Sequence, residues 1–159
     1  MRALAVVLGV AMALTANAAF AGSAQKTTGG MRWTTVVPEG QTEGDEAHAA
    51  WNADADGGQV QVRVVRPSTG ELVQRWHGTV DCYWQSGNIA TVGGHVTNLL
   101  LGTNTNEGPY FIFTVTDGGE GKNAAPDKFG MTRRDVPQLC PNRIVPSQPN
   151  AAGNVQVHG

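Results

Sequence analysis

Apolar and polar residues alternate in several short runs of this chain, and no window repeats apolar residues at helical spacing. The segment QVQVRVV, residues 59–65, shows this pattern plainly. A period of two places alternate side chains on opposite faces of a strand, whereas an amphipathic helix needs apolar residues three and four positions apart. Glycine and proline, which interrupt regular elements, are also frequent after residue 29. The sequence therefore predicts an all-β protein.

About eight short strands are expected, because turn clusters such as PSTG, QSGN and DGGEGKNAAPD separate the alternating runs. Antiparallel strands at this spacing form either a small barrel or a sandwich, and both architectures stay open. The predicted strands are Met31 to Val37, Ala47 to Ala53, Gln59 to Arg66, Leu72 to Trp84, Ile89 to Asn98, Tyr110 to Asp117, Lys128 to Thr132 and Asn154 to His158.

The segment WHGTVDCYWQSGNIATVGGHV predicts a hairpin whose register follows from its apolar pattern. A slip of one residue would turn one of the two apolar sets to solvent. When the two apolar sets are placed opposite each other, Trp84 pairs with Ala90. Two residues earlier on the first strand, Cys82 then pairs with Val92 and faces the core. This register needs an odd turn, which a three-residue connection over 86–88, with its asparagine in the left-handed region, would provide.

The N-terminal segment MRALAVVLGVAMALTANAAFAG has the features of a secretory signal peptide. One basic residue precedes an apolar run, and the ending Ala19-Phe20-Ala21 fits the cleavage rule. The run is too short to span a bilayer, and no later segment approaches the roughly 18 to 20 apolar residues that a span needs. We therefore expect a signal peptide at residues 1–21, and a secreted protein, periplasmic or extracellular, without a membrane span.

Cleavage would leave about 138 residues, enough for one domain with a single core. We divide them into an N-terminal linker with the first strand, residues 22–46, and a single β domain, residues 47–159, which the strand at 31–37 joins. Loss of Arg2 leaves ten of the eleven basic side chains against thirteen acidic ones, a formal charge of about -3. This balance offers no electrostatic footprint for nucleic acid, which is not expected as a partner.

Two cysteines, Cys82 and Cys140, are expected to form a disulfide, because an even number of cysteines in an exported chain favours a bridge over a metal or redox site. The bridge would close a loop of nearly sixty residues and contribute up to about 4 kcal/mol. The segment QLCPNRIVPSQPNAAG contains Pro141, Pro146 and Pro149, so we expect an irregular strap tied down at Cys140.

Two acidic segments invite a calcium interpretation. The stretch NADADGG, which begins at Asn52, matches the first half of an EF-hand loop, but the twelfth position, where a carboxylate closes the shell, is Arg63. A strand also follows where a helix is required, so a hairpin turn is the better interpretation. The second segment carries Asp117, Glu120 and Asp127 at spacings that match no calcium repeat, and we interpret it as a solvated turn.

The outer face of the central hairpin holds the best candidates for chemistry. In the deduced register His95 lies opposite Thr79, with His77 and Asp81 diagonally on either side. Two imidazoles and a carboxylate could bind a transition metal or act as acid and base, although any exposed face carries polar residues. We assign no catalytic residue, no metal and no cofactor, and keep His77, Asp81 and His95 as metal candidates.

Tryptophans offer the other possible site. Trp76 and Trp84 share the face of the hairpin that holds Val80, and few leucines and isoleucines are available, so aromatic rings are expected to fill the core. Exposed rings can instead stack on sugars, and we keep Trp33 and Trp51 as ligand-binding candidates. Nucleophilic catalysis finds little support, because no serine lies in a G-x-S-x-G context and no H-E-x-x-H pair occurs. Paired carboxylates for glycoside hydrolysis stay open, because such pairs meet only in the fold.

The run VDCYWQSGNIATVGGHVT, followed by PYFIFTVTDGGEG, DKF, Cys140 and GNVQVHG, resembles small secreted bacterial all-β proteins with no known activity. The resemblance implies an all-β fold and export, and transfers no functional residue. The leading hypothesis is a non-catalytic extracytoplasmic binding or structural module with a small-molecule or glycan ligand. The alternatives are a β-barrel carrier of a small apolar ligand, and a sugar-binding domain or unrecognised hydrolase.

Overall fold

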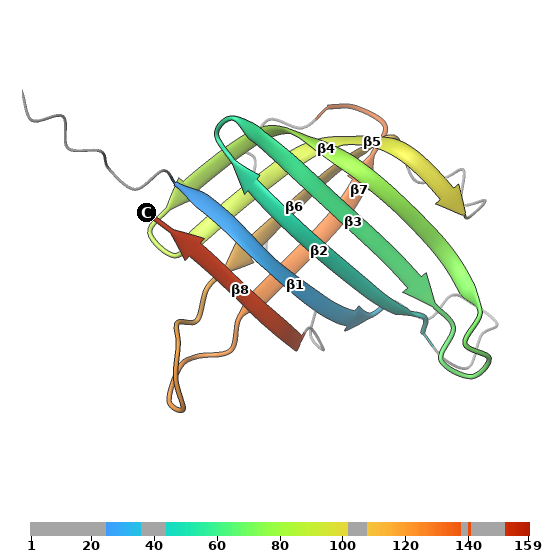
Figure 1. Ribbon diagram of the computed structural model, residues 1–159, viewed down its shortest axis with the longest axis horizontal. Coiled ribbons are helices and arrows are strands. Elements are labelled where there is room, and N and C mark those ends of the chain that lie inside the picture. Colours follow the sequence, from blue (N-terminus) through green and yellow to red (C-terminus); the bar gives the residue numbers. More distant parts are fainter. Residues whose placement is uncertain (1–24, 36–43, 102–107, 138–139, 141–151) are drawn as a thin grey trace, which may run out of the picture.

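A single curled sheet of eight antiparallel strands makes up the computed structural model (Figure 1), which describes residues 25–35, 44–101, 108–137, 140 and 152–159. The described residues contain no helix, so the all-β prediction is confirmed, and the curled sheet forms a half-barrel. The strands are β1 (Lys26–Thr34), β2 (Glu46–Asp54), β3 (Gly57–Val65), β4 (Leu72–Ser86), β5 (Ile89–Leu101), β6 (Tyr110–Thr116), β7 (Lys128–Arg134) and β8 (Ala152–His158).

The strands follow one another across the sheet in the order β7-β6-β5-β4-β3-β2-β1-β8. Seven consecutive strands form a meander, and β8 returns to pair with β1. Figure 1 shows β6 and β7 crossing behind β1, β2 and β3, so the sheet curls around its own inner face. The predicted signal peptide, residues 1–21, and most of the proline-rich segment around Cys140 lie outside the described residues.

All eight predicted strands occur in the structure, but β1 begins five residues before the predicted start at Met31. Its first half, KTTGG, carries no apolar alternation and gave no strand signal. Thr27 is nevertheless fully buried, and its hydroxyl donates to the carbonyl of Gln156 at 3.0 Å. At Gly29 a Cβ atom would lie 2.6 Å from the Asn154 carbonyl oxygen, so close packing against β8 requires glycine there.

Aromatic rings fill the inner face of the sheet and connect its two ends. Six of them are buried and in contact: Trp33, Trp51, Trp76, Phe111, Phe113 and Phe129. Phe129 on β7 lies 4.8 Å from Trp33 on β1 and 5.7 Å from Trp51 on β2, measured between ring centroids. These contacts join β7 to β1 and β2 across the open side of the half-barrel, so the aromatic cluster stabilises the curled shape of the sheet.

The central hairpin turns on two residues, and the predicted three-residue turn is wrong. Ser86 pairs with Ile89, Gly87 has a φ of 57°, and Asn88 does not adopt a positive φ. Glycine supplies the left-handed conformation at no steric cost, so asparagine is not needed for it.

The predicted pairings next to this turn are also wrong. Trp84 pairs with Thr91 instead of Ala90, and Cys82 pairs with Gly93 instead of Val92. A bulge between Val80 and Cys82 absorbs the one-residue offset, so that further along the strand Thr79 lies opposite His95 as predicted. Beyond the bulge Tyr83 packs against the core, and Cys82 and Trp84 take the outer face.

The predicted disulfide between Cys82 and Cys140 is confirmed, with a Cα–Cα distance of 5.6 Å. It lies on the outer face of the sheet and not in the core, because the bulge turns Cys82 outward. Cys140 is buried, and three other outer-face side chains, Thr91, Ile112 and Thr114, are also buried. The threonine hydroxyls lie 3.1 Å apart and form a hydrogen bond. The outer face of β5 and β6 is therefore covered around Thr91, Ile112 and Thr114.

Two aspartates of the segment between β6 and β7 bind the free edge of β8. Asp127 accepts hydrogen bonds from the backbone amides of Gly118, at 2.8 Å, and Val155, at 2.7 Å. Asp117 accepts one from the amide of Val157 at 3.0 Å. We call Asp117 and Asp127 the carboxylate clasp. The interpretation of this segment as a solvated turn is thus wrong for Asp117 and Asp127. Their carboxylates bind the outer edge of β8, whose backbone amides would otherwise be free to pair with a further strand.

Loss of the clasp should destabilise the protein. We expect Asp127→Ala to lower the free energy of unfolding by about 2 kcal/mol, because two amides lose a charged acceptor. Urea denaturation measures this, and hydrogen exchange should show faster exchange at Val155. Exposed Glu120 provides the control, since Glu120→Ala should change stability by less than about 0.5 kcal/mol. Equal effects of the two substitutions would show that the clasp contributes nothing.

Candidate functional site

The three metal candidates do not come together in the structure. His95 Nδ1 lies 2.7 Å from Asp81 Oδ2, and both side chains are exposed. His77 lies outside this pair, although its Nε2 atom is buried and has no hydrogen-bond partner within the described part of the chain. No group of three metal-ligating side chains occurs among the residues that the structure describes. His95 and Asp81 therefore form an exposed pair, and His77 is not part of it.

The two ligand-binding candidates on aromatic residues are core residues. Trp33 is 8% exposed and Trp51 is 6% exposed. The Trp51 indole donates to the Thr27 hydroxyl at 3.3 Å, and its ring stacks on Phe129. Neither indole ring presents a face to solvent, so neither can serve as a platform for a sugar in this structure.

The stretch NADADGG forms the turn between β2 and β3. Asp54 pairs with Gly57, and the Asp54 carboxylate accepts a hydrogen bond from the Asp56 amide at 2.8 Å. This local bond is typical of aspartate in turns. The hairpin interpretation of the stretch is thus confirmed, and Arg63, the residue at odds with a calcium loop, lies well along β3 on the outer face.

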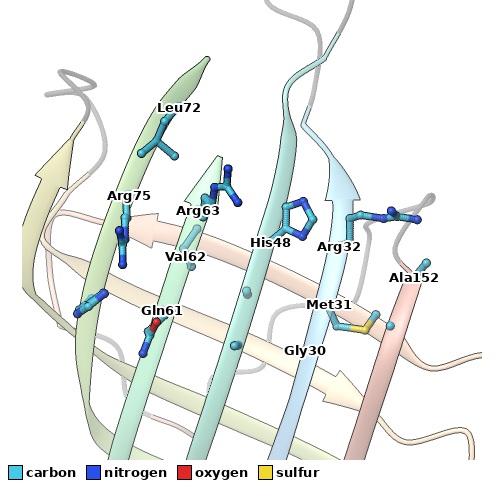
Figure 2. A pocket seen from close by; sticks show the side chains of 14 residues that line it. Gly30, Met31, Arg32, His48, Gln61, Val62, Arg63, Leu72, Arg75 and Ala152 are labelled. Atoms are coloured by element: carbon cyan, nitrogen blue, oxygen red, sulfur yellow. The ribbon is translucent and has the colours of Figure 1, made fainter. Parts of the chain in front are cut away.

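A wide groove crosses the outer face of five strands, β8, β1, β2, β3 and β4. Its volume is about 830 Å³. Small residues leave it hollow: Gly30, Ala50 and Gly153 line it where larger side chains would fill it. Figure 2 shows the side chains that line the groove, contributed by adjacent strands. No sequence motif indicates this groove.

Four basic side chains form a straight line across the groove. Arg32 pairs with His48, His48 with Arg63, and Arg63 with Arg75, so that β1, β2, β3 and β4 each contribute one residue at the same level. Figure 2 shows the four side chains side by side. We call Arg32, His48, Arg63 and Arg75 the basic row. Because neighbouring strands lie about 4.8 Å apart, the row is about 14 Å long.

The arginines of the basic row differ from Arg66, which directly follows β3 and has two acidic partners among the described residues. Arg66 contacts Glu71 at 2.7 Å and Asp45 at 3.5 Å. In contrast, Arg32, Arg63 and Arg75 are exposed, and none forms an ion pair with a described residue.

Like charges directly opposite each other destabilise a sheet. Within the row only His48 has an acidic neighbour, Glu46, whose carboxylate lies 2.6 Å from His48 Nε2. The three arginines of the row are therefore preformed cations, and an anion would relieve the repulsion between the neighbouring pair Arg63 and Arg75.

Two polar side chains lie next to the basic row. Gln61 pairs with His77 on the same face, two residues along β3 and β4 from Arg63 and Arg75. Both line the groove, and the buried, unpartnered Nε2 of His77 is part of this line. They add side-chain hydrogen-bonding groups beside the arginines.

The interior of the half-barrel offers much less space. A cavity of about 140 Å³ lies at one end of the inner face, beside Trp33, Val62 and Trp76, with the Arg133 guanidinium 5.6 Å from the Trp76 ring centroid. Pockets that bury a drug-sized ligand measure roughly 300 to 1,000 Å³. The packed aromatic core gives the apolar-carrier alternative little support.

Tyr83 also faces the interior, next to the turn between β2 and β3. Burial, with a smaller contribution from the charge of Asp54, raises the pKa of Tyr83 to about 12. Its hydroxyl donates a hydrogen bond to Gln85. Tyr83 therefore stays protonated at neutral pH and acts as a hydrogen-bond donor and not as a base.

No protein-family model matches the chain, and neither a curated protein nor a solved structure shows significant similarity to it. In the described part of the chain, no helix is long and apolar enough to cross a membrane. The assignment of the site therefore depends on the geometry of the groove and the basic row.

Proposed function

We propose that this protein is an exported, non-catalytic binding module that takes an anionic ligand in the groove, at the basic row. The observation that carries the proposal is the alignment, on four adjacent strands, of one histidine and three arginines that have no ion-pair partner among the described residues. The N-terminal signal pattern and the disulfide support export to the periplasm or the medium of a bacterium.

Arginine suits this role better than lysine would. Its planar guanidinium presents a fixed fork of N–H donors that can bind a carboxylate, sulfate or phosphate through two parallel hydrogen bonds. The chain as a whole has a formal charge of -2, so the local charge of the row, and not the net charge, would attract anions. A ligand that neutralises the row would also remove the repulsion between neighbouring arginines.

The alternative functions have weaker support. A sugar-stacking domain needs exposed rings, and Trp33 and Trp51 lie in the core. A hydrolase of unrecognised type would need converging acid and base groups, and the pair of Asp81 and His95 is open to solvent.

The proposal predicts saturable binding of simple anions at the basic row. Titration with inorganic pyrophosphate should shift backbone amide signals of β1, β2 and β3 near Arg32, His48 and Arg63 in nuclear magnetic resonance spectra. We expect Arg63→Ala to weaken this binding by about tenfold, because a hydrogen bond between charged groups is lost. The dissociation constant comes from the same titration.

Arg134 on β7 provides the matched control, because it is an exposed arginine outside the groove. Arg134→Ala removes the same charge and should leave pyrophosphate binding unchanged. Signals that never saturate, or equal losses in the two variants, would show that anions associate with the whole surface and would contradict the proposal.

A further inference from the structure

We infer that the cavity on the inner face of the sheet, beside Trp33 and Trp76, is a second binding site, and that it takes a small monocarboxylic acid with an apolar body. We call it the inner cavity. It lies on the opposite face of the sheet from the basic row, so the inference goes beyond the proposed function and does not depend on it. Three features carry it: the volume of the inner cavity, the chemistry of its walls and the position of Arg133.

The inner cavity lies at the end of the half-barrel where β1, β3 and β7 end and β4 begins. Trp33, Val64 and Arg133 are each the last residue but one of their strands. Val64 pairs with Gln74, and Arg133 pairs with the core residue Phe111, so these side chains share the inner face. Small-molecule sites often occupy such positions at the mouths of β-barrels.

The volume of the inner cavity, about 140 Å³, sets the size of the ligand. An apolar cavity of about 150 Å³ in another protein binds benzene. Drug-sized ligands need pockets of roughly 300 Å³ or more. The apolar body of the ligand is therefore a single ring or an aliphatic group of the same size.

Apolar side chains form most of the wall of the inner cavity. They are Trp33, Ala47, Val62, Val64, Trp76 and Met131. All except Met131 are buried, and Met131 packs against the core. An inorganic anion would lose its hydration against these side chains and gain no hydrogen bond from them. The walls therefore select a ligand with an apolar body.

Arg133 adds a positive charge to these apolar walls. It is the one charged side chain among the described lining residues, and its Nε atom is buried. Its guanidinium lies over the Trp76 ring, 5.6 Å from the centroid, in a cation–π contact. A guanidinium held against a ring keeps N–H donors along its edge, where a carboxylate can accept two parallel hydrogen bonds.

The walls and the charge together exclude simpler ligands. A neutral ring fits the walls but does not use the charge of Arg133, and an amine would be repelled by it. Thr35 and Gln74, which also line the inner cavity, provide neutral hydrogen-bonding groups. A ring or short branched chain with one carboxylate uses all of these features.

Benzoate is the probe for this site, because it combines one ring with one carboxylate. We expect saturable binding, followed by tryptophan fluorescence and by backbone amide shifts near Trp33 and Arg133 in nuclear magnetic resonance spectra, since both residues line the inner cavity. Benzyl alcohol and benzylamine have nearly the same size and should bind about tenfold more weakly, because neither can accept the charged hydrogen bonds. Naphthoate should also bind more weakly, because its second ring exceeds the volume.

Two variants test the charge. Arg133→Met keeps most of the side-chain volume and removes the guanidinium, so it should weaken benzoate binding by about tenfold. Arg134→Met is the matched control, because Arg134 is the next residue, is exposed and does not line the inner cavity. Benzoate binding should be unchanged in this control.

A third variant keeps every charge and fills the space. Ala47 is 1% exposed and lines the inner cavity, so Ala47→Leu should abolish benzoate binding. The dispersion of the amide spectrum reports whether the variant folds. If it does not fold, Arg133→Met and the naphthoate comparison test the same site without it.

Four outcomes would overturn the inference. Benzoate signals that do not saturate would show that no site exists, and equal binding of benzyl alcohol would show that the charge is not recognised. Equal losses in Arg133→Met and Arg134→Met would indicate non-specific attraction. If pyrophosphate displaces benzoate, both bind at the basic row, and only the proposed function survives. In contrast, saturable benzoate binding without any pyrophosphate binding would contradict the proposed function and leave the inner cavity as the site.

Discussion

Replacement of both cysteines, by Cys82→Ser with Cys140→Ser, is expected to lower the free energy of unfolding by about 4 kcal/mol. The two residues are 58 positions apart, so the bridge constrains a long loop in the unfolded chain. It also joins β4 to Cys140, which lies in the chain between β7 and β8. Urea denaturation under oxidising conditions measures the difference.

Two comparisons separate the bridge from the local packing of its side chains. The wild-type protein in reducing agent should lose as much stability as the double serine variant, because both lack the cross-link. Since the disulfide lies on the outer face of β4 and the groove lining does not include it, the folded variant should still bind pyrophosphate. A loss below about 1 kcal/mol would contradict the chain-entropy explanation.

The pattern of alternation was sufficient to find all eight strands but not to align them. Tyr83 and Trp84 are both large aromatic residues, so the sequence is equally consistent with either one facing the core. The bulge near Asp81 selects Tyr83, and it places Cys82 on the outer face. A one-residue bulge shifts the alternation by one position, and the pattern of period two does not reveal this shift where two consecutive residues are both aromatic.

The basic row was beyond sequence reasoning for a related reason. Arg32 and Arg63 each stand between two apolar residues and Arg75 precedes Trp76, a pattern that any solvent-facing strand position can show. Only the combined register of four strands, from Arg32 to Arg75, brings them into one line. From the sequence, Arg63 was notable only as a residue unsuited to calcium. Its neighbours in the basic row are set by the pairing of separate strands, which no local sequence pattern specifies.

The carboxylate clasp shows the same dependence on distant pairing. Asp117 and Asp127 lie in a segment whose composition predicts a turn, and the turn is present. Their partners, the amides of Val155 and Val157, belong to a strand far along the chain that pairs with β1. The sequence shows that Asp117 and Asp127 are polar, but only the topology of the sheet determines which groups they bind.

Phe129→Ala is expected to have an effect of about 3 to 5 kcal/mol on the free energy of unfolding, the usual range for truncation of a buried aromatic residue. Phe129 is 1% exposed, and its ring contacts those of Trp33, Trp51 and Phe113. Since β7 and β1 are not hydrogen-bonded neighbours, these ring contacts are a main connection across the open side of the sheet.

Phe129→Leu is the matched control, because it keeps most of the apolar volume while it removes the ring. We expect this variant to lose only about 1.5 kcal/mol, since volume-conserving apolar substitutions are well tolerated. Urea denaturation, followed by the fluorescence of the buried tryptophans, measures both variants. Hydrogen exchange should accelerate most on β7 and β8 in Phe129→Ala, because the two sheet edges separate first when the ring that connects them is lost. An equal increase of hydrogen exchange in all strands would show instead that Phe129 only stabilises the core and does not connect the two edges of the sheet.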